Sequence, residues 1–247
     1  VCASPYDLLD TQYRMHPAIS AFPSRRFYSS QVKDAPACAA ICEPWYTAHP
    51  FLGPLTMVEC EGAEEMDPRT RSLCNRAEAR AIVDVLQCYR RLYGVDVARR
   101  CCVITFYAAQ VNCIAALCGR SGLRDVAIHT VDSFQGSECD LVLVSLVRAN
   151  PGLQIGFVRE YRRINVCITR AKASLVLFGH TPTLHGPPGA QPADVSALVA
   201  HLHHLGLVFA AADPRRALEG QWTAQTRRPV RAPAPHPSPD PTPSPGP

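Results

Sequence analysis

The chain has 247 residues, a formal net charge of +4 and 47% hydrophobic residues. This length accommodates one sizeable α/β domain with tails, or two small domains, and the apolar content is enough for a filled core. The weak positive charge does not by itself indicate a nucleic-acid-binding protein. No apolar run reaches the ~20 residues of a membrane span, so we expect no membrane partner.

The cysteines and the start of the chain bear on its cellular context. The 12 cysteines are scattered, and no C-x-x-C pair occurs among them. Free thiols in this pattern predict a reducing compartment, hence a cytoplasmic or nuclear protein. No signal peptide is visible. The chain begins at Val1 rather than at methionine, as a piece of a longer protein would.

Short apolar runs alternate with helical stretches through the middle of the chain. The expected strands are residues 55–60, 102–106, 126–131, 141–147 and 174–179. The expected helices are residues 75–92, 108–118, 161–172 and 195–205. Apolar strands alternating with helices predict an α/β fold, with a parallel sheet covered on both faces in three layers. Ligands of such sheets bind beyond the carboxyl ends of the strands.

The helix 75–92 has a recognisable start. Asn75 and Glu78 have the spacing of a capping box, in which each side chain accepts from the other residue's backbone N–H. Apolar residues then recur at helical spacing, which predicts one buried face.

An arginine-rich segment, YRRINVCITRAK, lies between two apolar strands. Arg163 and Arg170 are seven residues apart, about two helical turns, so both side chains can point to one side of a helix. The fork of N–H donors on arginine suits a phosphate group. The alternative is a solvated basic face.

Two further segments carry polar side chains suited to a nucleotide. Tyr13 can stack on a base and Arg14 can hold a phosphate, although a core tyrosine beside a surface ion pair is the alternative. Glu138, in the loop DSFQGSECD, can accept hydrogen bonds from ribose hydroxyls. The alternative for that loop is a polar turn.

Two groups of potential metal ligands give only a weak sequence signal for a metal site. Cys38 and Cys42 with His49 downstream come nearest to a zinc pattern, but free thiols explain them better. The histidines of the helix 195–205 lack an accompanying carboxylate or cysteine, so we expect solvated side chains and no metal site. From residue 226 the chain is rich in proline and arginine, which predicts a disordered tail.

Four motifs in order, QYRMHP, VITFYAAQ, VDSFQGSECDLVLVSLVRAN and GFVREYRRINVCITRAKASLVLFG, resemble the second motor lobe of superfamily 1 helicases. The likeness is strongest to the branch that contains the nonsense-mediated-decay helicase and senataxin, and it spans about residues 8–179. It implies a RecA-like fold of the P-loop NTPase class.

The resemblance implies roles for five residues at the nucleotide. Tyr13 and Arg14 would lie against the base and the terminal phosphate, and Glu138 would contact the ribose. Arg170 would be an arginine finger, which together with Arg14 makes the catalytic pair. Arg163 would support it from the same helix.

The resemblance also implies a surface for a sugar–phosphate backbone. Its residues are expected in the loops around Thr105, Tyr107, Gln110, Thr130 and Asp132. Three positions depart from the family pattern. Phe106 replaces a usual proline, which is expected to change the geometry of its loop. Ser137 replaces a frequent basic residue and Cys139 a common lysine, so one or two backbone contacts are expected to be weaker.

The chain has no phosphate-binding P-loop of its own. That motif needs Gly-Lys, but Lys33 follows valine and Lys172, the only other lysine, follows alanine. The acidic magnesium motif of a first lobe is missing as well. ATP and Mg²⁺ would therefore be held mainly by a first lobe upstream or on a partner, and the isolated chain is expected to be inactive.

We therefore expect a RecA-like lobe over residues 1–183, a helical extension over 184–225 and a disordered tail over 226–247. The expected function is the C-terminal lobe of an ATP-dependent helicase or translocase acting on single-stranded RNA or DNA. The alternative is a catalytically silent binding or regulatory module derived from such a lobe. An unrelated enzyme that uses Arg170 on a phosphorylated metabolite is a weaker alternative, because the chain lacks a Gly-rich phosphate loop.

Overall fold

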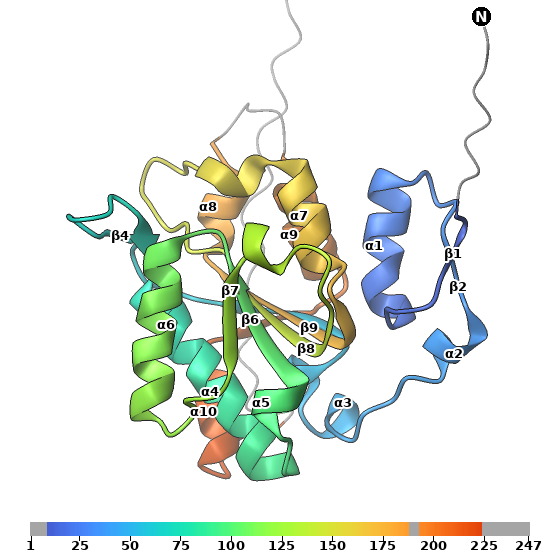
Figure 1. The fold of residues 1–247 in the computed structure, drawn as a ribbon, viewed down its shortest axis with the longest axis horizontal. Helices are drawn as coiled ribbons and strands as arrows, with labels where there is room; N and C mark the ends of the chain where they lie inside the picture. The colour runs from blue at the N-terminus through green and yellow to red at the C-terminus, as the bar shows by residue number, and fades with distance from the viewer. Residues whose placement is uncertain (1–8, 188–192, 224–247) are drawn as a thin grey trace, which may run out of the picture.

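The central sheet has six parallel strands in the order β10-β3-β9-β8-β6-β7. Figure 1 labels β9, β8, β6 and β7 of this sheet. This computed structural model describes residues 9–187 and 193–223. The strands are β3 (Leu55–Glu59), β6 (Cys101–Thr105), β7 (Ala127–Thr130), β8 (Cys139–Ser145), β9 (Ala171–Gly179) and β10 (Val208–Ala210). The five expected strands and the parallel α/β fold are confirmed. β10 was not expected, and it adds Val208–Ala210, from the expected helical extension, to the same sheet beside β3.

Helices cover both faces of the sheet. One face carries α1 (Pro17–Phe27), α7 (Tyr161–Ile168), α8 (Thr181–His185) and α9 (Asp194–His204). The other carries α4 (Arg76–Tyr93), α6 (Ala108–Arg120) and α10 (Ala212–Leu218). Alternate residues of β8 serve the two layers: Val142 packs on the first face and Leu143 on the second. This alternation explains why the strand is apolar throughout.

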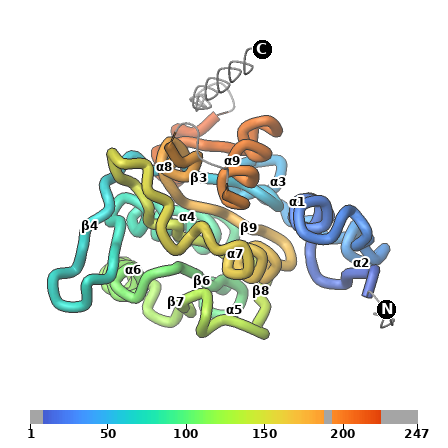
Figure 2. Tube along the Cα trace, turned by 90° about the horizontal axis from the view of Figure 1, so that it is seen from above, coloured from blue at the N-terminus to red at the C-terminus, as the bar shows by residue number. Residues whose placement is uncertain are grey.

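The shorter elements lie in the connections. They are β1 (Thr11–Gln12), β2 (Lys33–Asp34), α2 (Pro36–Ala39), α3 (Trp45–Ala48), η1 (Pro50–Leu52), β4 (Glu65–Met66), β5 (Leu73–Cys74), α5 (Val97–Arg100), η2 (Asp132–Phe134) and η3 (Gly156–Arg159). Both views place α1 and the N-terminal strands, in blue, at the side of the molecule (Figures 1 and 2). Contacts between α1 and α7 tie this segment to the sheet layer.

The start of α4 corrects the capping-box prediction. The Asn75 side chain does accept from the backbone N–H groups of Ala77 and Glu78, as an N-cap should. Glu78 does not complete the box. Its carboxyl is buried and accepts instead from the Ser145 hydroxyl at 2.6 Å and the Val147 N–H at 2.9 Å.

The end of α7 corrects a second prediction. The helix stops at Ile168, so Arg170 lies in the connection to β9 rather than on the helix. The Thr169 hydroxyl donates back to the Asn165 carbonyl at 2.7 Å, which satisfies one of the carbonyls left over at the helix end. Arg163 and Arg170 therefore do not share one helical face.

Two further predictions concern membrane spans and the C-terminal tail. Within the described residues, no helix combines the length and apolar content that crossing a membrane requires. The predicted disordered tail, residues 226–247, lies outside the described residues.

Candidate functional site

The first candidate region, which we call the amino-edge cluster, lies at the amino ends of β8 and β9. It comprises Arg14, Glu138, Arg170 and Lys172. β8 and β9 begin side by side, with Cys139 opposite Ala171 and the Cys139 N–H donating to the Arg170 carbonyl at 3.1 Å. The His16 N–H donates to the Lys172 carbonyl at 2.8 Å, which draws the N-terminal segment to this edge. The cluster thus lies opposite the carboxyl edge where the sheet rule would place a ligand.

Glu138 forms ion pairs with two basic side chains. The Arg14 Nε donates to its Oε2 at 2.5 Å, and the Lys172 Nζ lies 2.9 Å from its Oε1. The hydrogen bond from Lys172, followed by the one from Arg14, lowers the pKa of the Glu138 carboxyl below its ordinary value. The carboxyl is therefore ionised at neutral pH and has both oxygens engaged.

Arg170 has no carboxylate partner within the described part of the chain. Its Nε donates to the Val166 carbonyl at 2.9 Å and its Nη1 to the Ser137 carbonyl at 3.3 Å. Burial, and then the charge of Arg14, lower the pKa of its guanidinium. Arg14 in turn donates to the Thr169 carbonyl at 3.1 Å. Two neighbouring guanidiniums, one of them without a counter-ion, make this edge suited to an anion.

Tyr13 stands beside the cluster with 79% of its surface exposed. With Arg14 and Lys172 it borders a cavity of about 340 Å³. The Gln12 side chain shapes this turn, because its Oε1 accepts from the backbone N–H groups of Arg14 and Met15 at 2.9 and 2.7 Å. Our sequence reasoning missed Gln12 and Lys172 as site residues, although the motifs QYR and TRAK contain both.

Arg163 belongs to a different group from Arg170. Its guanidinium makes two hydrogen bonds of 3.1 Å to the Asp132 carboxylate and an ion pair of 3.3 Å with Glu160. Its guanidinium carbon also lies 5.9 Å from the centre of the Phe157 ring. The structure therefore brings Arg163 to Asp132, another predicted site residue, and its charge is balanced there.

The five residues predicted to bind a nucleic-acid backbone lie at the carboxyl edge, but they differ in how exposed their side chains are. Thr105 and Thr130 end the paired strands β6 and β7. Asp132 is exposed and Thr130 is half-buried, bonded to Ser133. Thr105 and Tyr107 are buried.

Gln110 is fully buried, so a direct ligand contact does not fit this structure. Its amide bridges Asn75 and Ser145 inside the protein. The Nε2 donates to the Ser145 hydroxyl at 2.9 Å, and the Oε1 accepts from the Asn75 N–H at 2.8 Å. Gln110 and Thr105, which is also 0% exposed, are therefore not accessible in this structure, and their predicted role in binding stays a prediction. Thr105 is the last residue of the buried strand β6, and Gln110 lies in the first turn of α6, on its buried side.

Neither group of potential zinc ligands forms a metal centre in the described part of the chain. There, no three His, Cys, Asp or Glu side chains gather where they could hold a metal ion. Cys38 is buried and its thiol faces the Gln12 carbonyl, while Cys42 is exposed. All the described cysteines are free thiols.

The chain is similar to a set of helicases. It matches the family described as an AAA domain over residues 2–182. It is 35% identical to Helicase SEN1 of Saccharomyces cerevisiae, over 74% of this chain and 8% of that protein. It is 36% identical to Regulator of nonsense transcripts 1 of Caenorhabditis elegans, over 71% of this chain and 17% of that protein. It is also 36% identical to Probable helicase MAGATAMA 3 of Arabidopsis thaliana, over 74% of this chain and 23% of that protein. The chain thus spans less than a quarter of each relative's length.

Proposed function

Because this chain belongs to the AAA-domain family of superfamily 1 helicases, in the branch of the nonsense-mediated-decay helicase and senataxin, we propose that it is the second RecA-like lobe of an ATP-dependent helicase or translocase. The observation that carries this proposal is the amino-edge cluster. It brings two arginines to one open edge, and Arg170 there lacks a carboxylate partner in the described part of the chain. A first lobe holding the P-loop would supply the ATP and the Mg²⁺.

In this proposal the lobe closes over the triphosphate with its amino edge. Arg170 approaches the γ-phosphate as the arginine finger and stabilises the negative charge of the phosphoryl group in transfer. Tyr13 lies against the base. Arg14 exchanges Glu138 for phosphate, since both side chains are exposed enough for an ion pair of low net energy to open. Lys172 stays with Glu138 and leaves one carboxylate oxygen for the ribose hydroxyls.

The carboxyl edge would bind the single strand of RNA or DNA. Asp132 and Thr130 are accessible there, with Arg163 held against Asp132. Thr105 and Gln110 would act by shaping this edge from inside. Contacts of this kind are largely independent of base sequence.

The test is an ATPase assay on the longer protein that joins this chain to its upstream segment, with single-stranded RNA and with single-stranded DNA. We expect Arg170→Ala to lower turnover about 10³- to 10⁵-fold, the range of arginine fingers. Arg162→Ala is the matched control, because Arg162 is exposed on α7, where its guanidinium lies over the Tyr161 ring and its Nε donates to the Tyr161 hydroxyl at 3.1 Å. The isolated chain should show no ATPase activity.

Full turnover by the Arg170→Ala protein would refute the finger assignment. A joined protein without any ATPase activity, even with nucleic acid present, would favour the silent binding module. Circular dichroism of each variant would show that the lobe is folded.

A further inference from the structure

A cavity of about 460 Å³ opens at the carboxyl edge, away from the amino-edge cluster. It lies between the β4–β5 hairpin and the loops that follow β6 and β8. The side chains around it that matter here are Met66, Arg71, Tyr107, Arg148 and Phe157. Its size is that of a small-molecule site.

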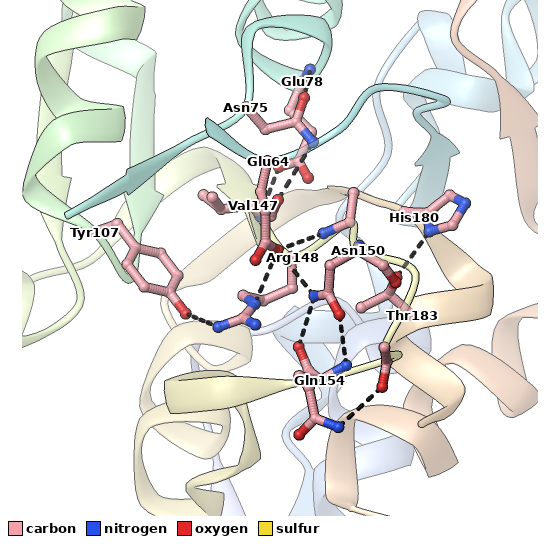
Figure 3. A network of polar contacts seen from close by, with 12 residues as sticks. Glu64, Asn75, Glu78, Tyr107, Val147, Arg148, Asn150, Gln154, His180 and Thr183 are labelled. Atoms are coloured by element: carbon pink, nitrogen blue, oxygen red, sulfur yellow. Dashed lines mark hydrogen bonds and ion pairs between the residues drawn. The ribbon is translucent and has the colours of Figure 1, made fainter. Parts of the chain in front are cut away.

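A strained backbone fixes one wall of this cavity. Val147 has φ +70°, a left-handed conformation that is rare for a β-branched residue. Glu78 accepts from the Val147 N–H at 2.9 Å, and the Asn75 amide donates to the Val147 carbonyl at 3.3 Å (Figure 3). Both polar groups of the strained residue are thus held from α4, and the chain leaves β8 in one defined direction with Arg148 next.

Arg148 is held in place from three sides. Its Nε lies 3.0 Å from the Glu64 Oε2, and its Nη1 donates to the Tyr107 hydroxyl at 3.4 Å (Figure 3). Gly156 forms the third side. Its φ is +62°, and a β-carbon there would overlap the Arg148 Nη1 and lie 3.1 Å from the Tyr107 hydroxyl. Glycine at 156 therefore suits both the left-handed backbone and the close approach of Arg148.

Phe157 forms an exposed aromatic surface at the mouth of the cavity. It is 62% exposed, so one face of its ring is open to a ligand. The Tyr107 ring centre lies 5.9 Å from its own, and the Arg163 guanidinium carbon is also 5.9 Å from its ring centre. An exposed ring supported by a second ring and a cation is the arrangement that stacks unpaired bases.

The charges around the cavity favour a neutral planar ligand inside and an anion at the rim. Arg148 is neutralised by Glu64, so its guanidinium offers no uncompensated charge for a phosphate. Arg71, on the hairpin, is exposed and forms no ion pair in the described part of the chain. A nucleotide unit meets both conditions, with its base on Phe157 and its phosphate at Arg71.

We propose that this cavity binds an unpaired base of single-stranded nucleic acid, stacked on Phe157. The proposal rests on the proposed function, since it specifies how the carboxyl edge would hold the strand. It adds Phe157, Arg148 and Gly156 to that edge, none of which was predicted from the sequence as a site residue.

The test measures binding of the full chain to a fluorescein-labelled single-stranded oligonucleotide by anisotropy, and to the same oligonucleotide with abasic sites. We expect Phe157→Ala to weaken binding of the intact oligonucleotide about 5- to 100-fold, the range of base–aromatic stacking. Binding of the abasic oligonucleotide should change less than twofold. Phe157→Trp should restore binding, because it restores the ring.

Leu205→Ala is the matched control, since Leu205 is a similarly exposed apolar side chain, at 50%, on the remote end of α9. Equal losses on the intact and abasic oligonucleotides would overturn the proposal, because the variant would then act on backbone contacts or on folding. No loss on either would also overturn it. So would a wild-type chain that binds neither oligonucleotide.

These outcomes are separate from those of the ATPase test. A Phe157→Ala chain that binds normally leaves the Arg170 assignment intact. Conversely, a joined protein without ATPase activity leaves selective loss of base binding as evidence for the cavity.

Discussion

Two arginine–glutamate pairs, one at each edge of the sheet, are chemically alike but differ in their surroundings. At the amino edge, the side chains of Arg14 and Glu138 are 33% and 40% exposed. At the carboxyl edge, those of Arg148 and Glu64 are 13% and 15% exposed. An exposed pair has little net energy and can exchange partners, whereas a buried pair is costly to break. The first pair therefore suits a site that must open for ligand, and the second suits a fixed wall.

The largest expected difference follows from removing the Glu64 carboxylate, which is largely shielded from solvent. Glu64→Ala leaves the charge of Arg148 unpaired and also removes the acceptor of the Ala149 N–H and the Asn150 amide. We expect the free energy of unfolding to fall by about 3 kcal/mol. Urea denaturation monitored by circular dichroism measures it. A loss under about 1 kcal/mol would mean that the carboxyl-edge pair is as exchangeable as the amino-edge pair.

An intermediate effect concerns pH. Burial raises the pKa of Glu78 to about 8, well above its ordinary value of 4.5. Between these two values the folded state keeps a proton that the unfolded state releases. The contribution of Glu78 to the free energy of unfolding is therefore fully present below about pH 4.5. It decreases as the pH rises towards about 8, by at most about 1.4 kcal/mol per pH unit.

The variant Glu78→Gln keeps an acceptor for the Val147 N–H but cannot ionise. We expect its free energy of unfolding to fall less between about pH 5 and about pH 8 than that of the wild type, by roughly 1–3 kcal/mol. Burial also raises the pKa of Glu59, to about 7, so part of the decline should persist. Urea titrations of both proteins at the two pH values would measure the difference, and parallel pH profiles would contradict the prediction.

The smallest expected effect is at the exposed pair. Glu138→Gln removes a carboxylate whose two ion pairs are open to solvent. We expect the free energy of unfolding to change by less than about 0.5 kcal/mol. The same denaturation assay, run beside Glu64→Ala, tests the comparison directly. A loss similar to that of Glu64→Ala would show that the amino-edge cluster is structural rather than poised for a ligand.

The sequence predicted the secondary structure well where the signal is local. The apolar runs of β3, β6, β8 and β9 were found within a few residues, because a strand buried on both faces must be apolar along its length. The half-buried edge strand β7 was also found. β10 was missed because it has only three residues and depends on pairing with β3. The helix through Arg170 was extended too far, because helical spacing does not show where Thr169 ends the helix.

The candidate site was predicted in part. The motifs indicated which residues belong to it, but not the contacts that these residues make with distant parts of the chain. The motifs indicated Arg14, Glu138 and Arg170 together, and the structure does gather them. The motifs also indicated Gln110, a polar residue in the first turn of α6. Nothing local reveals that its amide is used inside the protein, by residues 35 positions away.

By itself, the sequence determined the alternation of strands and helices and the order of the motifs, because periodicity and turn chemistry act over a few residues. Only the tertiary structure decided which charges became exposed pairs and which became buried ones. Arg14 and Glu138 are 124 residues apart, and Arg148 meets Glu64 only because β8 leaves the sheet through the strained Val147. Burial depends on what packs around a side chain, and that is set by contacts between distant segments rather than by the residue's neighbours in the chain.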